Sequence, residues 1–162
     1  MALIPAGILF SLILPLTLVF VSSIIDSYFE LKGLILEPFN YILAIPLIFV
    51  GLLFSAWSVW VQFRLGRGTP LPMMPTQRLI IDGPYAYCRN PMTFGILIYY
   101  IGLDFWVNSL SMIMLIALLA SLLILYIKLI EEKELEARFG QEYLEYKKRT
   151  PFLIPRRRRV KE

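Results

Sequence analysis

Four long apolar segments constrain this chain more than any other feature of its sequence. A membrane-spanning helix needs about 20 mostly apolar residues, because the bilayer core offers no water to the backbone. Segments of this kind cover residues 7–25, 41–63, 93–107 and 110–130. The third segment is the shortest and is separated from the fourth only by Asn108 and Ser109, which favours a tight helical hairpin. The sequence therefore predicts an all-α membrane protein with about four transmembrane helices.

The composition agrees with this architecture. Hydrophobic residues make up 58% of the 162-residue chain, whereas an ordinary soluble domain is nearer half apolar. We therefore expect one integral-membrane domain over residues 1–162, with connecting segments at 64–91 and 131–162.

Basic residues are concentrated in two of these connecting segments. The segment 64–91 and the tail 131–162 are rich in Lys and Arg, whereas the connection after the first apolar segment has only Lys32 beside three acidic residues. Because cytoplasmic loops carry the excess of Lys and Arg, both termini and the 64–91 loop are predicted to be cytoplasmic.

The first segment lacks a basic leader and a cleavage site, so we expect it to be a true span and not a signal peptide. The expected membrane is a prokaryotic inner membrane.

The amino-acid composition excludes several kinds of active site. The chain has one cysteine, Cys88, and no histidine, so an intrachain disulfide, a His-Cys zinc site and Ser-His-Asp chemistry cannot form. We expect no metal site, and a buried packing role for Cys88.

Charged residues at the edges of two apolar segments predict a polar site. Arg89 lies just before the third segment, and Glu131 and Glu132 directly follow the fourth. Ionisable residues are costly in hydrocarbon, so such a set at a membrane edge indicates function. An Arg fork suits a carboxylate and the Glu pair suits an ammonium or ribose, so the ligand is expected to be charged at both ends. Tyr85 and Tyr87 are either ligand contacts or interfacial aromatics.

The tail is predicted to form an amphipathic helix over residues 131–148. Its apolar stripe consists of Leu135, Phe139, Tyr143 and Tyr146, and Gly140 is expected to bend or break it. The segment after Pro151 is expected to pack back on the bundle, and the helix to be an interfacial helix, a lid over the site, or both. The cluster Arg156–Arg159 predicts contact with anionic lipid, and no aromatic-interleaved basic face predicts nucleic acid.

These motifs together resemble the integral-membrane methyltransferases. The resemblance rests on Gly83-Pro84-Tyr85-x-Tyr87-x-Arg89-x-Pro91-Met92, on Glu131-Glu132, and on Phe139-Gly140-x-Glu142-Tyr143-x-x-Tyr146. The superfamily includes isoprenylcysteine carboxyl methyltransferases and phospholipid N-methyltransferases, and the similarity covers roughly residues 64–155.

The resemblance implies S-adenosylmethionine as the cofactor, held near the cytoplasmic interface. It implies binding by Arg89, Asn90, Pro91, Thr93, Glu131 and Glu132. We further expect Arg89 and Glu132 to be catalytic, and we count Tyr85 and Tyr87 as candidate cofactor contacts. Asn90 and Thr93 replace the His and Tyr of the isoprenylcysteine form, and Asn-Pro-Met resembles the phospholipid form. The expected acceptor is lipophilic and enters from the membrane, as an isoprenylcysteine carboxylate or a phospholipid amine.

Two other functions stay open from the sequence. Sterol-reductase-like membrane enzymes that use NADPH have a similar aromatic tail and an Arg-x-Pro turn, although the Glu131-Glu132 pair and the small size argue against them. The third possibility is a non-catalytic lipid-binding membrane protein. Such a protein would have no need of a charged loop that faces Glu131-Glu132.

Overall fold

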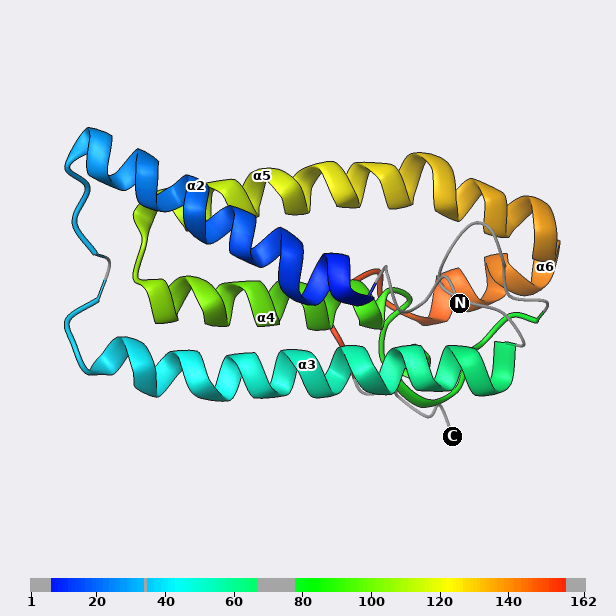
Figure 1. Cartoon of the computed structure of the whole chain (residues 1–162). Helices are drawn as coiled ribbons and strands as arrows, with labels where there is room; N and C mark the ends of the chain where they lie inside the picture. The colour runs from blue at the N-terminus through cyan, green and yellow to red at the C-terminus, as the bar shows by residue number, and fades with distance from the viewer. Residues whose placement is uncertain (1–6, 34, 67–77, 157–162) are drawn as a thin grey trace. The chain divides into compact units, whose positions relative to one another are not determined.

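The chain is all-α, as predicted. A computed structural model describes residues 7–33, 35–66 and 78–156, and these residues contain no strand (Figure 1). The main helices are α2 (Leu14–Phe29), α3 (Phe39–Gly66), α4 (Pro91–Val107), α5 (Leu110–Tyr126) and α6 (Glu132–Arg149). Short helical segments are η1 (Leu9–Ile13), η2 (Gly83–Ala86) and η3 (Ile127–Glu131).

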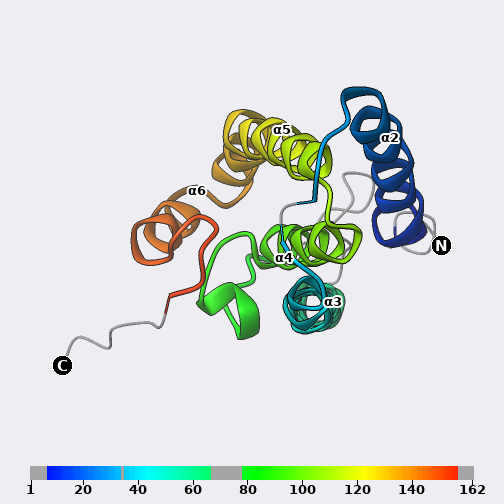
Figure 2. The same cartoon turned by 90° about the vertical axis from the view of Figure 1, so that its left-hand side faces the viewer.

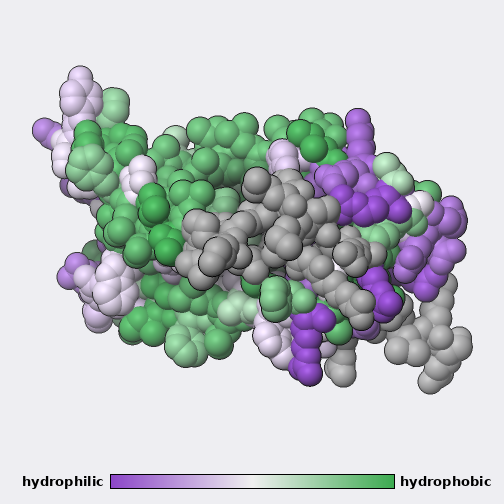
Figure 3. All heavy atoms as spheres, turned by 45° about the vertical axis from the view of Figure 1, so that its right-hand side comes forward, coloured by the Kyte–Doolittle hydropathy of each residue, from purple (hydrophilic) through white to green (hydrophobic). Residues whose placement is uncertain are grey.

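Among the residues that the structure describes, three helical segments are long and apolar enough to cross a membrane. They cover Leu9–Phe29, Phe39–Gly66 and Leu110–Arg149, and α4 is a shorter apolar helix of 17 residues. Large apolar side chains such as Phe20, Phe49 and Leu118 are more than half exposed, and hydrophobic residues cover much of the helical surface in Figure 3. Exposed apolar surface of this extent is stable in lipid and not in water. The protein is therefore an integral membrane protein.

The chain groups into two compact units, which we describe separately. The first comprises Met1–Leu52 with Gly95–Leu123, and its buried core consists of Leu18 of α2, Tyr100 of α4, and Met112 and Ile116 of α5. Glycines bring two helices of this unit together: a Cβ at Gly102 would lie 2.7 Å from the backbone nitrogen of Ile48, so no larger residue fits there.

The predicted hairpin of the third and fourth apolar segments is confirmed. α4 ends at Val107 and α5 begins at Leu110. Between them Asn108 adopts a left-handed φ of 60°, and its side-chain amide bonds both the N–H and the C=O of Ile35. Ser109 Oγ accepts a bond from the Met112 N–H and so caps the start of α5.

The second unit, Leu53–Phe94 with Ile124–Glu162, contains the predicted polar segments. Its amphipathic helix α6 is confirmed, and Gly140 breaks it with φ 53° and ψ −127°. Beyond α6 the chain runs beside the loop that precedes α4 (Figure 2), where the N–H groups of Arg89 and Asn90 donate to the carbonyls of Pro151 and Phe152. The tail segment therefore packs back on the bundle, as expected.

Some predicted features lie outside the described residues. These are the part of the connecting segment 64–91 that holds Arg67, Gly68, Pro70, Pro72 and Pro75, and most of the basic cluster, Arg157, Arg158 and Arg159.

Candidate functional site

A tight turn brings Arg89 to the start of α4. Gly83, the first residue of η2, has a φ of 61°, a conformation that glycine adopts without strain. Cys88 is fully buried beneath this turn, and burial raises the pKa of its thiol to about 11. A thiol of that kind stays protonated at neutral pH, which agrees with the predicted packing role.

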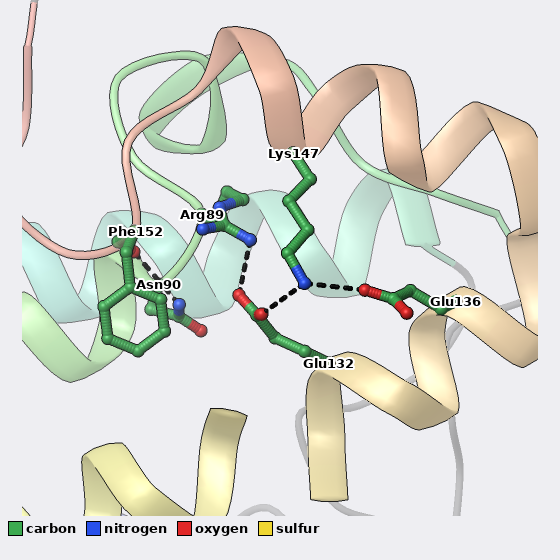
Figure 4. Close-up of polar contacts among 6 residues, drawn as sticks. All are labelled: Arg89, Asn90, Glu132, Glu136, Lys147 and Phe152. Atoms are coloured by element: carbon green, nitrogen blue, oxygen red, sulfur yellow. Dashed lines mark hydrogen bonds and ion pairs between the residues drawn. The ribbon is translucent and has the colours of Figure 1, made fainter. Parts of the chain in front are cut away.

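Arg89 forms a buried ion pair with Glu132, the first residue of α6. Arg89 Nη1 donates to Glu132 Oε1, and the two side chains are only 11% and 8% exposed (Figure 4). The pair thus joins two of the segments that the sequence indicated. Because both charges are largely removed from water, each one depends on the other for stabilisation.

Lys147 extends this pair into a network. Its Nζ lies 2.8 Å from Glu132 Oε2 and 2.6 Å from Glu136 Oε1 (Figure 4). In a straight α-helix, residues 132 and 147 would be about 22 Å apart along the axis. The break at Gly140 turns the second half of α6 back, so that both residues reach the same place.

Phe152 covers the arginine from the tail segment. Its ring lies 5.6 Å from the Arg89 guanidinium carbon and 5.1 Å from Lys128 Nζ, and both are cation–π distances. The Asn90 side-chain amide donates to the Phe152 carbonyl at 3.0 Å. Asn90 therefore uses its side chain to fasten the tail to the loop.

The two predicted tyrosines lie in different surroundings. The Tyr85 hydroxyl donates to Gln62 Oε1 at 2.8 Å, and the Tyr85 carbonyl accepts a bond of 2.7 Å from the Tyr146 hydroxyl. Burial, assisted by the negative charge of Glu131, raises the pKa of Tyr85. Tyr87 is 41% exposed, and its carbonyl accepts a bond from the Arg156 N–H.

One hydrogen-bond donor of Arg89, the N–H at Nε, has no partner among the described residues. Arg89 Nε is buried and has no hydrogen-bond partner within residues 7–33, 35–66 and 78–156. An unmade hydrogen bond at a buried guanidinium is costly, and an oxyanion beside it would complete the set. A surface hollow of this unit is lined by Ile81, Ala86, Glu142 and Tyr146 and does not include Arg89 or Glu132. The ion pair, rather than the hollow, marks the site.

The structure brings together Arg89, Asn90 and Glu132 of the predicted set. Pro91 is the buried first residue of α4, and Glu131 is half-buried directly before Glu132. Lys147 and Phe152 were not predicted as site residues. No rule of sequence spacing predicts a contact between Lys147 and Glu132 across the break in α6. A contact of Phe152 could have been found from the sequence, because the segment after Pro151 was expected to pack back on the bundle.

A comparison with known families identifies the chain. The sequence model of the family described as phospholipid methyltransferase matches residues 39–142, which is more than half of the 162 residues. The chain belongs to the phospholipid methyltransferase family. The resemblance seen in its motifs is confirmed by this match. The matched region contains Arg89, Glu131 and Glu132 and ends before Lys147 and Phe152.

A curated relative covers a smaller region. The chain is 33% identical over 78 residues to the cobalt-zinc-cadmium resistance protein CzcN of Cupriavidus metallidurans. The aligned region is 48% of this chain and 36% of the relative, so the chain spans about a third of the length of that protein. No solved structure matches the sequence.

Proposed function

We propose that this methyltransferase transfers a methyl group from S-adenosylmethionine to a lipophilic acceptor that reaches the site from the membrane. The observation that carries the proposal is the buried network of Arg89, Glu132 and Lys147 in a member of a methyltransferase family. The remaining predicted residues are proposed as its surroundings: Tyr85, Tyr87, Asn90, Pro91 and Glu131.

The charges of this network fit the amino-acid end of the cofactor. Arg89 would bind the carboxylate, because its Nε is buried and unpartnered among the described residues and its guanidinium can make a paired contact. Glu132 would bind the ammonium group, with Lys147 keeping its second oxygen in place at 2.8 Å. When bound, the cofactor supplies a methyl group already activated by a positive sulfur.

The protein's contribution is then mainly alignment and exclusion of water. Methyl transfer needs the two reacting atoms at roughly 3–3.5 Å in a fixed orientation, which can lower the barrier by several kcal/mol. The Phe152 ring over Arg89, together with the bond from Asn90 to the Phe152 carbonyl, would keep the charged end of the site closed to water.

The family description favours a phospholipid amine over an isoprenylcysteine carboxylate as the acceptor. An amine must lose a proton before it attacks, so a base is needed. The Tyr85 hydroxyl is engaged with Gln62, and burial raises its pKa, so it is a poor base. Glu132 is held in two ion pairs. Glu131, half-buried and without an ion-pair partner among the described residues, is the proposed base.

The setting of the reaction follows from the distribution of charge in the sequence. We propose a prokaryotic inner membrane with both termini and the Arg89 site on the cytoplasmic side, where the cofactor is made available. The basic end of the chain would contact anionic lipid there.

Calorimetric titration of S-adenosylhomocysteine into the purified protein in detergent tests the cofactor. We expect micromolar binding, and no binding of NADPH in a parallel titration. Binding of NADPH alone to a folded sample would favour a reductase, and binding of neither would leave a lipid-binding role.

The acceptor is tested with S-adenosylmethionine labelled in its methyl group. Mixed micelles would contain either a phospholipid with a primary amine or an isoprenylcysteine analogue with a free carboxylate. Labelled lipid is expected only with the amine. Label in the carboxylate compound instead would contradict the proposed acceptor while leaving the cofactor intact.

A further inference from the structure

A second set of acidic and hydroxyl side chains lies in the other unit of the molecule. Asp104 of α4 is completely buried, and neither of its carboxylate oxygens has a hydrogen-bond partner among the described residues. Asp104 falls within the third apolar segment, where an ionisable residue is costly unless a partner compensates it. A carboxylate left in this position therefore requires an explanation.

Oxygen donors lie at the connection between α4 and α5, which follows Asp104 closely in the chain. Asp26 of α2 lies close enough for its charge to act on the Asp104 carboxylate. Asp26 Oδ1 accepts a bond of 3.2 Å from the Ser111 N–H, and Ser109 Oγ lies 3.3 Å from Ser111 Oγ. The Ser111 hydroxyl in turn donates to the Ser22 carbonyl at 3.0 Å.

Helix capping explains only part of this cluster. Asp26 and Ser109 accept bonds from N–H groups at the start of α5, where a negative charge is favourable. Asp104 accepts no such bond among the described residues, and the charge of Asp26, which acts on it, has the same sign. Two carboxylates in a poorly hydrated place are stable when a positive group lies between them.

We propose that Asp104 and Asp26, assisted by the hydroxyls of Ser109 and Ser111, bind a hard cation. Carboxylate and hydroxyl oxygens are the donors that Ca²⁺, Mg²⁺ and similar ions prefer, and nitrogen and sulfur donors are absent from this cluster. Asp26 is half-buried rather than enclosed, so an ion can reach the cluster from water.

The site would act on the hairpin and not on methyl transfer directly. None of its residues takes part in the network around Arg89, so the proposal does not depend on the proposed function. A bound ion would tie α2 to the α4–α5 connection by neutralising the charges of the two aspartates. Its predicted effect is on stability.

The test is thermal unfolding of the full chain in detergent at constant ionic strength. Choline chloride serves as the reference, and NaCl, CaCl₂ and MgCl₂ replace it in separate samples. We expect at least one of these cations at millimolar concentration to raise Tm by roughly 3–8 °C, because ligand binding to the folded state stabilises it. Luminescence of bound Tb³⁺, excited through Trp106 two residues from Asp104, gives a second measurement.

Substitutions separate the site from a general salt effect. Asp104→Asn should abolish the cation-dependent rise in Tm and the Tb³⁺ signal, and it should raise Tm in choline chloride because an uncompensated charge is removed. Asp82→Asn changes an exposed aspartate in the same way and should retain the cation response.

The proposal is overturned if no cation changes the Tm of the wild type, or if Asp104→Asn responds as the wild type does. A Tm that rises only on acidification would also overturn it, because Asp104 would then be kept neutral by a proton.

Discussion

Arg89 and Glu132 hold opposite charges in a place where neither is well solvated. Their side chains are 11% and 8% exposed, so most of the solvation of each charge is lost on folding. The attraction between them offsets that loss only while both are present. Lys147, at 2.8 Å from Glu132, adds a second positive charge to the same carboxylate. Glu132 is therefore the residue on which the electrostatics of the site depend most.

We predict that Glu132→Gln lowers the affinity for S-adenosylhomocysteine at least 100-fold. The amide retains the shape of the side chain but cannot neutralise Arg89 or an ammonium group. Leaving a buried Arg89 unpaired should also lower the free energy of unfolding by about 3 kcal/mol. Calorimetry measures the first effect, and chemical or thermal unfolding in detergent the second, with circular dichroism to verify helical content.

Glu134→Gln is the matched control for this substitution. Glu134 is 53% exposed and pairs with Arg138 one helical turn away, so water screens the pair. Its loss should cost less than about 0.5 kcal/mol and leave binding unchanged. Normal ligand affinity in Glu132→Gln would show that the site lies elsewhere.

Cys88 gives a prediction with a defined pH dependence. Its pKa is raised to about 11 by burial, whereas an unfolded thiol titrates near 8.5. Alkylation by iodoacetamide at pH 8 should therefore be roughly 100-fold slower in the folded protein than in denaturant.

The raised pKa also means that the contribution of Cys88 to stability is present below about pH 8.5 and is lost as the pH rises towards 11. Cys88→Ala should bind S-adenosylhomocysteine normally, and loss of binding would contradict a packing role.

At the scale of elements, the break in α6 decides whether the site exists. Gly140 has φ 53° and ψ −127°, a conformation that residues with a Cβ rarely adopt. The two halves of α6 otherwise have ordinary helix formers and i,i+4 pairs, Glu134 with Arg138 and Glu145 with Arg149. A single residue thus reverses an element that would otherwise continue outward.

Gly140→Ala should therefore destabilise the protein by about 1–3 kcal/mol and weaken ligand binding. A Cβ at Gly140 would have no atom within 4 Å, so steric clash is not the reason. The cost is conformational, and alanine also favours a straight helix that separates Glu132 from Lys147. Thermal unfolding and calorimetry measure the two effects.

Gly7→Ala provides the comparison, because it also has open space around its Cβ and lies in a helix without a positive φ. It should leave Tm unchanged or raise it slightly. The same change in Tm for Gly140→Ala and Gly7→Ala would mean that alanine does not strain the backbone at position 140.

At the scale of the whole molecule, the distribution of charge predicts the orientation in the membrane. The segment 64–91 and the tail carry most of the basic residues, and the connection between α2 and α3 carries Glu30 and Glu37. Lysine and arginine are retained on the cytoplasmic side. In the proposed orientation, the Arg89 network would face the cytoplasm, where the proposed cofactor is soluble.

We predict that a fluorescent protein fused after Glu162 is fluorescent in a bacterial host and that alkaline phosphatase fused there is inactive. Phosphatase inserted after Lys32 should be active, because that connection is expected to face the other side. Active phosphatase at the C-terminal end would reverse the predicted orientation and place the Arg89 site outside the cytoplasm.

The sequence alone determined the helical segments, and it predicted the motif residues proposed for the site. Hydropathy is a local property, so residues 7–25, 41–63, 93–107 and 110–130 could be recognised as helices without knowledge of packing. The position of Arg89 before one apolar segment, and of Glu132 after the next, is equally local. Gly140 was expected to break its helix for a local reason as well, since glycine disfavours an uninterrupted helix.

Only the tertiary structure decided which side chains meet. Lys147 reaches Glu132 because the chain reverses at Gly140, and the direction of that reversal is encoded in no repeat or spacing. The approach of Asp26 to Asp104 likewise depends on how α2 packs beside the hairpin. Contacts between residues distant in the chain follow from close packing of many side chains at once, and a pattern along one segment does not contain that information.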